Sequence, residues 1–266
     1  MVPTPDAPTR KVVVPAAGLA VRAAALCAVL LATSAAAYVL PSWSILRRMA
    51  GAREELNLSA LRVDGSASFF GTAAREAAAA MGQPADRSEV QVDGAVMIRI
   101  PNRCRFELNP VEGAKAASVL TDAKPRREGR ELAPLDQAIE TLCEVLAART
   151  GEEGQAREQV TQYLKANKVE TATTSLARFS GQVAYVLGNP AEGSAQFWVY
   201  KDSFLPARML LEDKGVKWDV RFIDFTSPVT GEAFPRLVEV HRNGELALRF
   251  TALKSDSRAT LADKLF

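Results

Sequence analysis

The sequence has 266 residues, of which 48% are hydrophobic, 24% charged and 7% aromatic, so there is room for one large globular domain or two small ones. Lys and Arg number 33 against 31 Asp and Glu, and this balance excludes a broad basic field for nucleic acid or anionic lipid. A single histidine excludes a His-rich metal site and leaves little scope for histidine-based acid–base catalysis.

The first 37 residues have the pattern of an export signal peptide. It contains an apolar run over 23–31. Arg10, Lys11 and Arg22 form its positive region, and Ser34-Ala35-Ala36-Ala37 has the Ala-x-Ala cleavage pattern. The alternative is an uncleaved membrane anchor over 23–40, which at roughly 18 residues is barely long enough to span a bilayer. Cleavage would remove three basic residues and one acidic residue, and would leave a single domain over 38–266 with no net charge.

Two cysteines remain after the signal, Cys104 and Cys143, and an even pair suits an oxidising compartment. They are about 39 residues apart, so a disulfide between them would stabilise the fold by roughly 3–4 kcal/mol through the entropy of the unfolded chain. The alternative is a pair of buried free thiols.

The spacing of apolar residues predicts the elements up to residue 166. They are a helix over 42–56, a strand over 61–69, an alanine-rich helix over 72–81, strands over 90–100 and 104–108, and helices over 134–146 and 155–166. In the strand over 90–100, one side carries Val90, Val92, Val96, Ile98 and Ile100, and the other carries Gln91, Asp93, Met97 and Arg99. Gly94 predicts a bulge or bend in this strand, and the charged run Lys124–Glu128 is interpreted as a solvated loop.

The last third of the chain is predicted to be a series of strands separated by short turns. The strands cover 182–187, 196–200, 207–211, 216–222, 237–241 and 246–253. Asn243-Gly244 is the strongest hairpin signal among the turns. The strands alternate between apolar and polar residues, which indicates an antiparallel sheet with one buried face. The predicted fold class is therefore α+β, a strongly curved antiparallel sheet with helices against its apolar side.

The residues give no sign of an active site. There is no phosphate loop, no dinucleotide fingerprint and no CxxC motif. His241 is placed beside Glu239 on the polar face of a strand and has no nucleophile partner. Asp213, Asp219 and Asp224 fall in turns or on the wet side of a strand, so they are interpreted as solvated surface charges. We therefore expect no enzyme activity, no cofactor and no metal.

The apolar faces leave two interpretations open. They form either a packed core between sheet and helices or the wall of a cavity that holds an acyl chain. Periodicity alone does not distinguish a filled interior from a hollow one.

Two segments resemble the LolA/LolB-like family of periplasmic lipoprotein carriers. The segment over 94–106 has the glycine, alternating strand, proline and following strand of that family. The segment over 197–208 has its aromatic strand, acidic turn, Leu-Pro and next strand. Weaker matches are found at 222–225, 234–235 and 261–266. The resemblance implies an open half-barrel sheet, with helices forming a lid over an apolar concave face that holds acyl chains.

Carried onto this sequence, the resemblance implies a set of lipid-binding residues on the cavity strands. They are Val96, Ile98, Ile100, Val199, Trp218, Val220, Phe222, Leu248 and Phe250. One position departs from the family, because Ile100 stands where the carriers typically have an arginine that holds the lid closed. The neighbouring Arg99 is expected to point to the opposite face. A Cys104–Cys143 disulfide would tie the central helix to the sheet.

The sequence thus predicts a periplasmic protein that binds lipid acyl chains or a lipoprotein without catalysis. The alternative is an envelope interaction or sensor protein that binds a partner polypeptide on the same scaffold, with no lipid cargo. We expect a monomer that does not bind nucleic acid.

Overall fold

The structure, a computed structural model, describes residues 39–148 and 154–266. The predicted export signal or anchor over 1–37 lies outside these residues, which belong to one compact unit, Val39–Phe266. Among the described helices, none has the length and apolar character needed to cross a bilayer.

A single sheet contains the twelve strands of the described residues, and each neighbouring pair is antiparallel. The order is β5-β4-β3-β2-β1-β12-β11-β10-β9-β8-β7-β6, so β5 and β6 are the edges and the sheet is not closed. The strands are β1 (Ala60–Phe70), β2 (Glu89–Arg99), β3 (Arg103–Asn109), β4 (Ala116–Thr121), β5 (Lys124–Glu128), β6 (Thr174–Phe179), β7 (Gln182–Leu187), β8 (Gln196–Tyr200), β9 (Pro206–Asp213), β10 (Val216–Ile223), β11 (Leu237–Arg242) and β12 (Glu245–Asp256).

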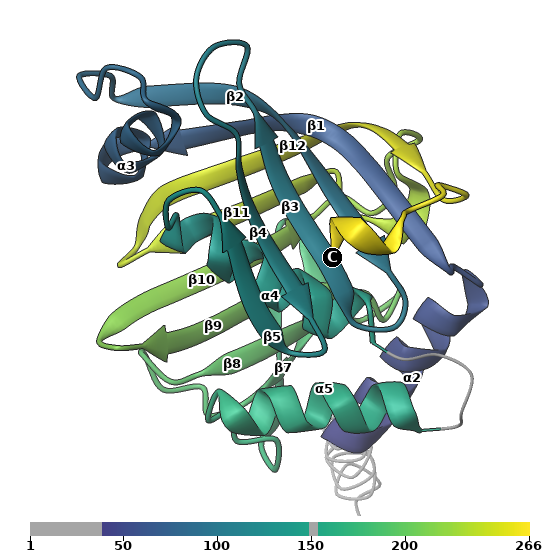
Figure 1. Ribbon diagram of the computed structural model, residues 1–266. Coiled ribbons are helices and arrows are strands. Elements are labelled where there is room, and N and C mark those ends of the chain that lie inside the picture. Colours follow the sequence, from purple (N-terminus) through teal and green to yellow (C-terminus); the bar gives the residue numbers. More distant parts are fainter. Residues whose placement is uncertain (1–38, 149–153) are drawn as a thin grey trace, which may run out of the picture. The chain divides into compact units, whose positions relative to one another are not determined.

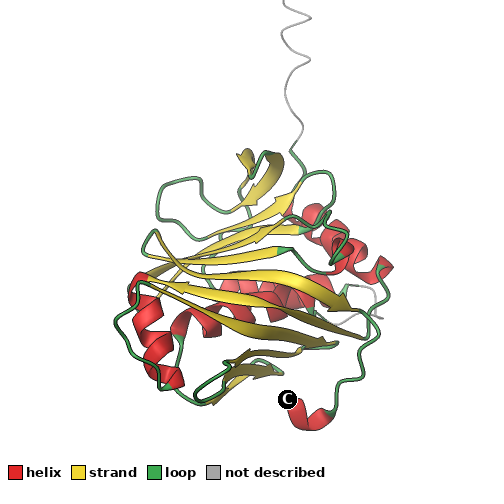
Figure 2. Cartoon of the chain, turned by 90° about the horizontal axis from the view of Figure 1, so that it is seen from above, coloured by secondary structure: helices red, strands yellow, loops and turns green. Residues whose placement is uncertain are grey.

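Within the described residues, four α-helices and two short 3-10 turns accompany the sheet. They are α2 (Ser42–Glu55), α3 (Gly71–Met81), α4 (Ala133–Leu146), α5 (Gln155–Ala166), η2 (Gly231–Ala233) and η3 (Asp263–Leu265). The α+β class and the curved, open sheet expected from the sequence are confirmed. The view from above shows strands on either side of a central helix (Figure 2).

Helix α4 lies inside the curve of the sheet and contacts strands of both halves, β3 and β4 on one side and β10, β11 and β12 on the other (Figure 1). Ten of its fourteen residues are buried. A helix that is buried on most of its circumference needs apolar partners all round. The concave face supplies them, because the alternating strands place their apolar residues on that side.

Aromatic side chains fill the space between the strands and the helix. Phe250 of β12 lies at the centre, with its ring 5.1 Å from that of Phe106 and 6.2 Å from that of Phe234, both in edge-to-face geometry. All three rings are fully buried. The inner wall of the sheet is therefore a packed core at this point.

The expected disulfide is present between Cys104 of β3 and Cys143 of α4, with a Cα–Cα distance of 5.7 Å. It closes a loop of 39 residues and attaches the central helix covalently to the sheet. The alternative of two free thiols does not apply.

The interpretation of Lys124–Glu128 as a solvated loop is wrong. These residues form the edge strand β5, which pairs with β4 and remains largely exposed. Exposed arginines and Pro125, which lacks an N–H group, are the features that protect edge strands from further pairing. Because an edge strand can be charged on both faces, its composition resembles that of a loop.

The bulge expected at Gly94 is also absent, because β2 pairs with β1 and β3 in continuous register through this residue. The irregularity lies opposite, between Asp64 and Gly65 of β1, where the pairing with β12 shifts. A Cβ atom at Gly65 would lie 2.3 Å from the carbonyl oxygen of Thr251. The glycine at position 65 therefore permits the close approach of β12.

Candidate ligand site at the mouth of the half barrel

A pocket of about 300 Å³ lies where the two arms of the sheet face each other across the N-terminal half of α4. We call it the mouth pocket. It is lined by Ser118, Val119, Leu120, Ala123, Pro125, Arg127, Glu131, Ala133, Asp136, Gln137, Ile139, Glu140, Glu144, Asp213, Lys214 and Trp218. These residues come from β4 and β5, from α4, and from the β9–β10 hairpin. The pocket therefore forms only when three distant parts of the chain meet.

The floor of the mouth pocket is mainly apolar, although the buried Ser118 and Gln137 also line it. Leu120 of β4, Ile139 of α4 and Trp218 of β10 are all buried there, and Trp218 is only 6% exposed. The rim carries charges of both signs, including an ion pair of 2.7 Å between Arg127 and Asp136. An apolar floor below a charged rim is the arrangement that binds amphiphilic molecules.

Acidic residues at intervals of four follow one side of α4 along the rim: Asp136, Glu140 and Glu144. Burial raises the pKa of Glu140, and the like charges of Glu144, Asp213 and Asp136 raise it further. Burial also raises the pKa of Glu144, against a hydrogen bond from Gln159 that lowers it. Glu140 and Glu144 are thus held where their charged forms are disfavoured, which is frequent at functional sites.

The C-terminal end of α4 is fixed from several directions. Besides the Cys104–Cys143 disulfide, Arg53 of α2 donates a hydrogen bond of 3.1 Å to the carbonyl oxygen of Leu146. The main-chain N–H group of Asn102 donates one of 2.9 Å to the carbonyl oxygen of Ala147. These donors satisfy carbonyl groups that a helix end leaves unpaired.

Arg53 itself is buried among main-chain carbonyl groups. Its second partner segment is η2, where it donates a hydrogen bond of 2.8 Å to the carbonyl oxygen of Ala233. Burial lowers the pKa of Arg53 to about 10. The arginine therefore connects α2, α4 and η2 at the end of α4 away from the mouth pocket.

The structure places the nine predicted lipid-binding residues on the inner side of the sheet. Trp218 lines the mouth pocket. The other eight belong to the packed core or lie against it: Val96, Ile98, Ile100, Val199, Val220, Phe222, Leu248 and Phe250. These side chains point inward, as the alternation of apolar and polar residues predicted. The space that they face is filled by α4.

Arg99 points to the opposite, convex face, as expected, and binds the carboxylate of Asp263 there. Ile100 is half-buried against the core. The arginine that the resemblance led one to look for at position 100 is thus replaced by an apolar side chain. In this chain, Arg53 and the disulfide fix the central helix instead.

The polar residues considered as possible catalytic groups lie on the polar face of the sheet, in a turn or at the mouth pocket. His241 lies 3.4 Å from the Glu239 carboxylate on the polar face, as expected. Asp224 caps its own turn by accepting a hydrogen bond of 3.1 Å from the N–H group of Thr226. Asp213 lines the mouth pocket. No group of three or more His, Cys, Asp or Glu side chains within 39–148 and 154–266 is placed to hold a metal ion.

The interpretation of Asp219 as a solvated charge is wrong. It is 9% exposed and lies 2.7 Å from both Arg208 and Arg221. Hydrogen bonds from the two guanidinium groups lower the pKa of Asp219, in opposition to its burial, which raises it. Alternation correctly gave the face of the sheet, but long arginine side chains cover a carboxylate on that face.

Sequence reasoning missed Arg53 and the acidic series on α4. The signal for the series was present, because acidic residues four apart in a predicted helix share one face. No comparable signal marks Arg53, since its burial depends on α4 and η2, which are distant in the sequence.

No family model and no curated protein matches this chain. Similar solved structures include a LolA superfamily protein from Nitrosomonas europaea, with 12% identity, a TM-score of 0.44, and coverage of 85% of this chain and 97% of that one. A domain described as an outer membrane lipoprotein-sorting protein from Vibrio parahaemolyticus has 9% identity, a TM-score of 0.37, and coverage of 82% and 94%.

Pseudomonas aeruginosa MucB, in its complex with MucA, has 15% identity and a TM-score of 0.25, and the match covers 85% of this chain and 60% of that one. The first two structures belong to the kind of protein that the sequence motifs resemble. At these identities and TM-scores the likeness concerns the fold, and it assigns no role to any residue.

Proposed function

We propose that the chain is an exported, periplasmic binding protein that holds an acyl chain of a lipid or lipoprotein in the mouth pocket, without catalysis. The observation that carries the proposal is the pocket itself, whose buried floor of Leu120, Ile139 and Trp218 lies below a charged rim. An acyl chain with a polar head group matches both parts. The disulfide supports an oxidising compartment such as the periplasm.

The volume and the rim define the ligand further. About 300 Å³ is at the lower end of ligand pockets, which span roughly 300–1,000 Å³, so the pocket holds part of an acyl chain. The rim combines Arg127 and Lys214 with several carboxylates. Mixed charge suits a zwitterionic or peptide-linked head group better than a strongly anionic one. Deeper entry, toward the other eight predicted residues, requires α4 to move.

Fluorescence quenching by brominated acyl chains tests the proposal directly. Trp218 is left as the sole tryptophan by Trp43→Phe and Trp198→Phe, and the variant is titrated with a phosphatidylethanolamine brominated on one acyl chain. We expect saturable quenching, because Trp218 is in the floor of the pocket. A matched variant that keeps only Trp198, which lies on the convex face beside Arg208, should not be quenched.

A blocking substitution gives a second measurement. Ala133 lines the mouth pocket and is half-buried, so Ala133→Phe should fill part of it and weaken binding at least tenfold. Ala85→Phe, on an exposed turn away from the pocket, is the control and should bind normally. Unquenched Trp218 at saturating lipid, or equal quenching of Trp198, would contradict the proposal.

A second candidate function is the binding of a partner polypeptide with no lipid cargo. It is favoured by a separate observation, the filled interior under a helix that the disulfide attaches to the sheet. Native mass spectrometry of the protein purified from the periplasm distinguishes the two. Protein that is consistently empty of lipid, recovered with one stoichiometric polypeptide partner, would favour this second function.

A further inference from the structure

The convex face of the sheet, which is mostly polar, carries a small apolar patch. The patch consists of Ala60, Ala95 and Met97 of β1 and β2. The chain's own C-terminal segment covers it, with contacts from Ala259, Leu261, Leu265 and Phe266. Met97 is 1% exposed as a result, although it points away from α4. We call this surface, with the arginines described next, the convex groove.

Two arginines recognise the acidic residue of the segment that occupies the groove. Arg99 of β2 and Arg103 of β3 both bind the carboxylate of Asp263, the latter at 2.9 Å. Two guanidinium groups on one carboxylate give charge-assisted hydrogen bonds, which are stronger than neutral ones. The groove therefore selects an acidic side chain at this position.

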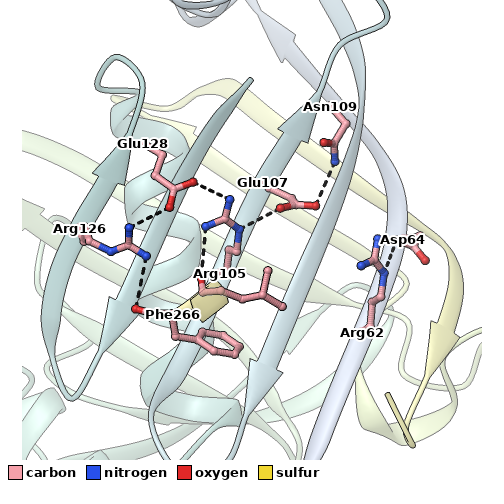
Figure 3. Close-up of polar contacts among 9 residues, drawn as sticks. Arg62, Asp64, Arg105, Glu107, Asn109, Arg126, Glu128 and Phe266 are labelled. Carbon is pink, nitrogen blue, oxygen red and sulfur yellow. Dashed lines mark hydrogen bonds and ion pairs between the residues drawn. The ribbon is translucent and has the colours of Figure 1, made fainter. Parts of the chain in front are cut away.

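Two further arginines and a threonine recognise the main chain of the same segment. Arg105 donates a hydrogen bond of 3.2 Å to the carbonyl oxygen of Leu265. Arg126 donates a hydrogen bond of 3.3 Å to the main-chain oxygen of Phe266 (Figure 3). Thr121 donates one of 3.4 Å to the same oxygen. Contacts to main-chain atoms are available to any peptide of similar conformation.

The arginines are held in place by residues of the sheet. Glu128 of β5 binds Arg105 at 2.7 Å and Arg126 at 2.8 Å, and Glu107 of β3 binds Arg105 at 2.9 Å (Figure 3). The hydrogen bond from Arg105 is the main cause that lowers the pKa of Glu128 to about 2. Arg105 and Arg126 are thus held in position by the sheet as well as by the segment, which reduces the cost of binding at this part of the groove.

The segment that occupies the groove is held weakly. The side chain of Asp263 is 76% exposed, and exposed ion pairs contribute only about 0–1 kcal/mol each.

We propose that the convex groove is a peptide-binding site for a partner polypeptide, and that residues 259–266 occupy it as an intramolecular competitor. The recognised pattern is an acidic residue followed, two and three positions later, by Leu and Phe, as in Asp263-Lys264-Leu265-Phe266. A tethered segment has a high effective concentration, so a partner binds when its own segment binds the groove more tightly or is present in excess. This site is separate from the mouth pocket, and its test does not depend on lipid binding.

The test uses a fluorescent, amidated peptide with the sequence of residues 259–266. It is titrated against the full chain and against a full-length variant whose own segment is weakened by Asp263→Ala and Leu265→Ala. We expect the variant to bind the peptide at least tenfold more tightly than the wild-type chain, because its competitor is impaired. Adding Arg103→Gln to the variant, or replacing Asp by Asn in the peptide, should reduce binding about tenfold.

The control is Arg62→Gln in the same weakened chain. Arg62 lies on the same face but pairs with Asp64 of its own strand, so this change should leave peptide binding unaltered (Figure 3). Hydrogen exchange of the wild-type chain gives an independent measurement, since excess peptide should accelerate exchange of the amides over 259–266. The proposal is overturned if the folded, weakened chain does not bind millimolar peptide, or if Arg62→Gln reduces binding as much as Arg103→Gln.

Discussion

Carboxylates at the mouth pocket and on the convex face of the sheet are held in opposite ways. At the mouth pocket, burial and the like charges of Glu144 and Asp213 raise the pKa of Glu140. On the convex face, hydrogen bonds from His241 and Arg249 lower the pKa of Glu239 to about 2. The charged form of Glu239 therefore stabilises the fold, whereas the charged form of Glu140 opposes it. A loss of folding stability of this kind is expected at a surface that binds a ligand, but not at a surface that only covers the core.

The largest effect should come from removing a ring from the concave face. Phe250→Ala leaves a cavity among the rings of Phe106 and Phe234, and we expect it to lower the free energy of unfolding by about 3–5 kcal/mol. Phe179→Ala, which removes a half-buried ring beside Trp198 on the convex face, should cost about 1 kcal/mol. Urea denaturation measures both, and equal losses would contradict the distinction between the two faces.

Removing the disulfide tests how firmly α4 is attached to the concave face. Replacing Cys104 and Cys143 by Ser should lower the free energy of unfolding by about 3–4 kcal/mol, because a loop of 39 residues becomes free in the unfolded chain. Reductant should have the same effect on the wild-type protein and none on the variant. A variant as stable as the oxidised protein would refute this expectation.

On the convex face, Glu239→Gln removes a carboxylate that pairs with Arg249 at 2.8 Å. We expect a loss of about 1–3 kcal/mol at pH 7. Because the folded protein lowers this pKa, the contribution is complete above the ordinary value of 4.5 and disappears as the pH falls to about 2. Denaturation from pH 7 to pH 2 should therefore show the wild-type and variant curves converging.

At the mouth pocket, replacing a carboxylate by an amide should raise the free energy of unfolding instead of lowering it. Glu140→Gln removes repulsion from Glu144, one turn away, and should stabilise the protein by about 0.2–0.5 kcal/mol at pH 8. Since folding raises this pKa, the wild-type protein gains stability as the pH falls through the raised value, and the variant does not. Glu192→Gln, on an exposed loop, is the control and should change neither stability nor its pH dependence.

Most elements of the fold could be predicted from the sequence because their apolar residues have a clear period. Helix α5 begins and ends at the predicted residues, and the strands of the last third are each found within a few positions. The strands β4, β5 and β6 were missed for different reasons. β4 is buried through five consecutive residues and so lacks alternation, whereas β5 is a charged edge strand. β6 is half-buried along most of its length, which weakens its pattern.

The candidate site was predictable only in part. Alternation correctly placed residues such as Trp218 and Phe250 on the inner side, because side chains in a strand alternate between its faces. Whether the space in front of them is open depends on where α4 lies, and this position is fixed by contacts with distant segments. The same limit applies to Met97, whose burial on the convex face requires the segment over 259–266.

The attachment of α4 at one end has a mechanical consequence. Cys143 is bonded to the sheet and Leu146 is held by Arg53, so α4 can move only by rotating about its last turn. Any opening would be a wedge, widest at Ala133 and narrowing to nothing near Cys143, over a helix roughly 20 Å long. Each further methylene group of an entering acyl chain would meet a narrower space, so the opening would select acyl chains by their length.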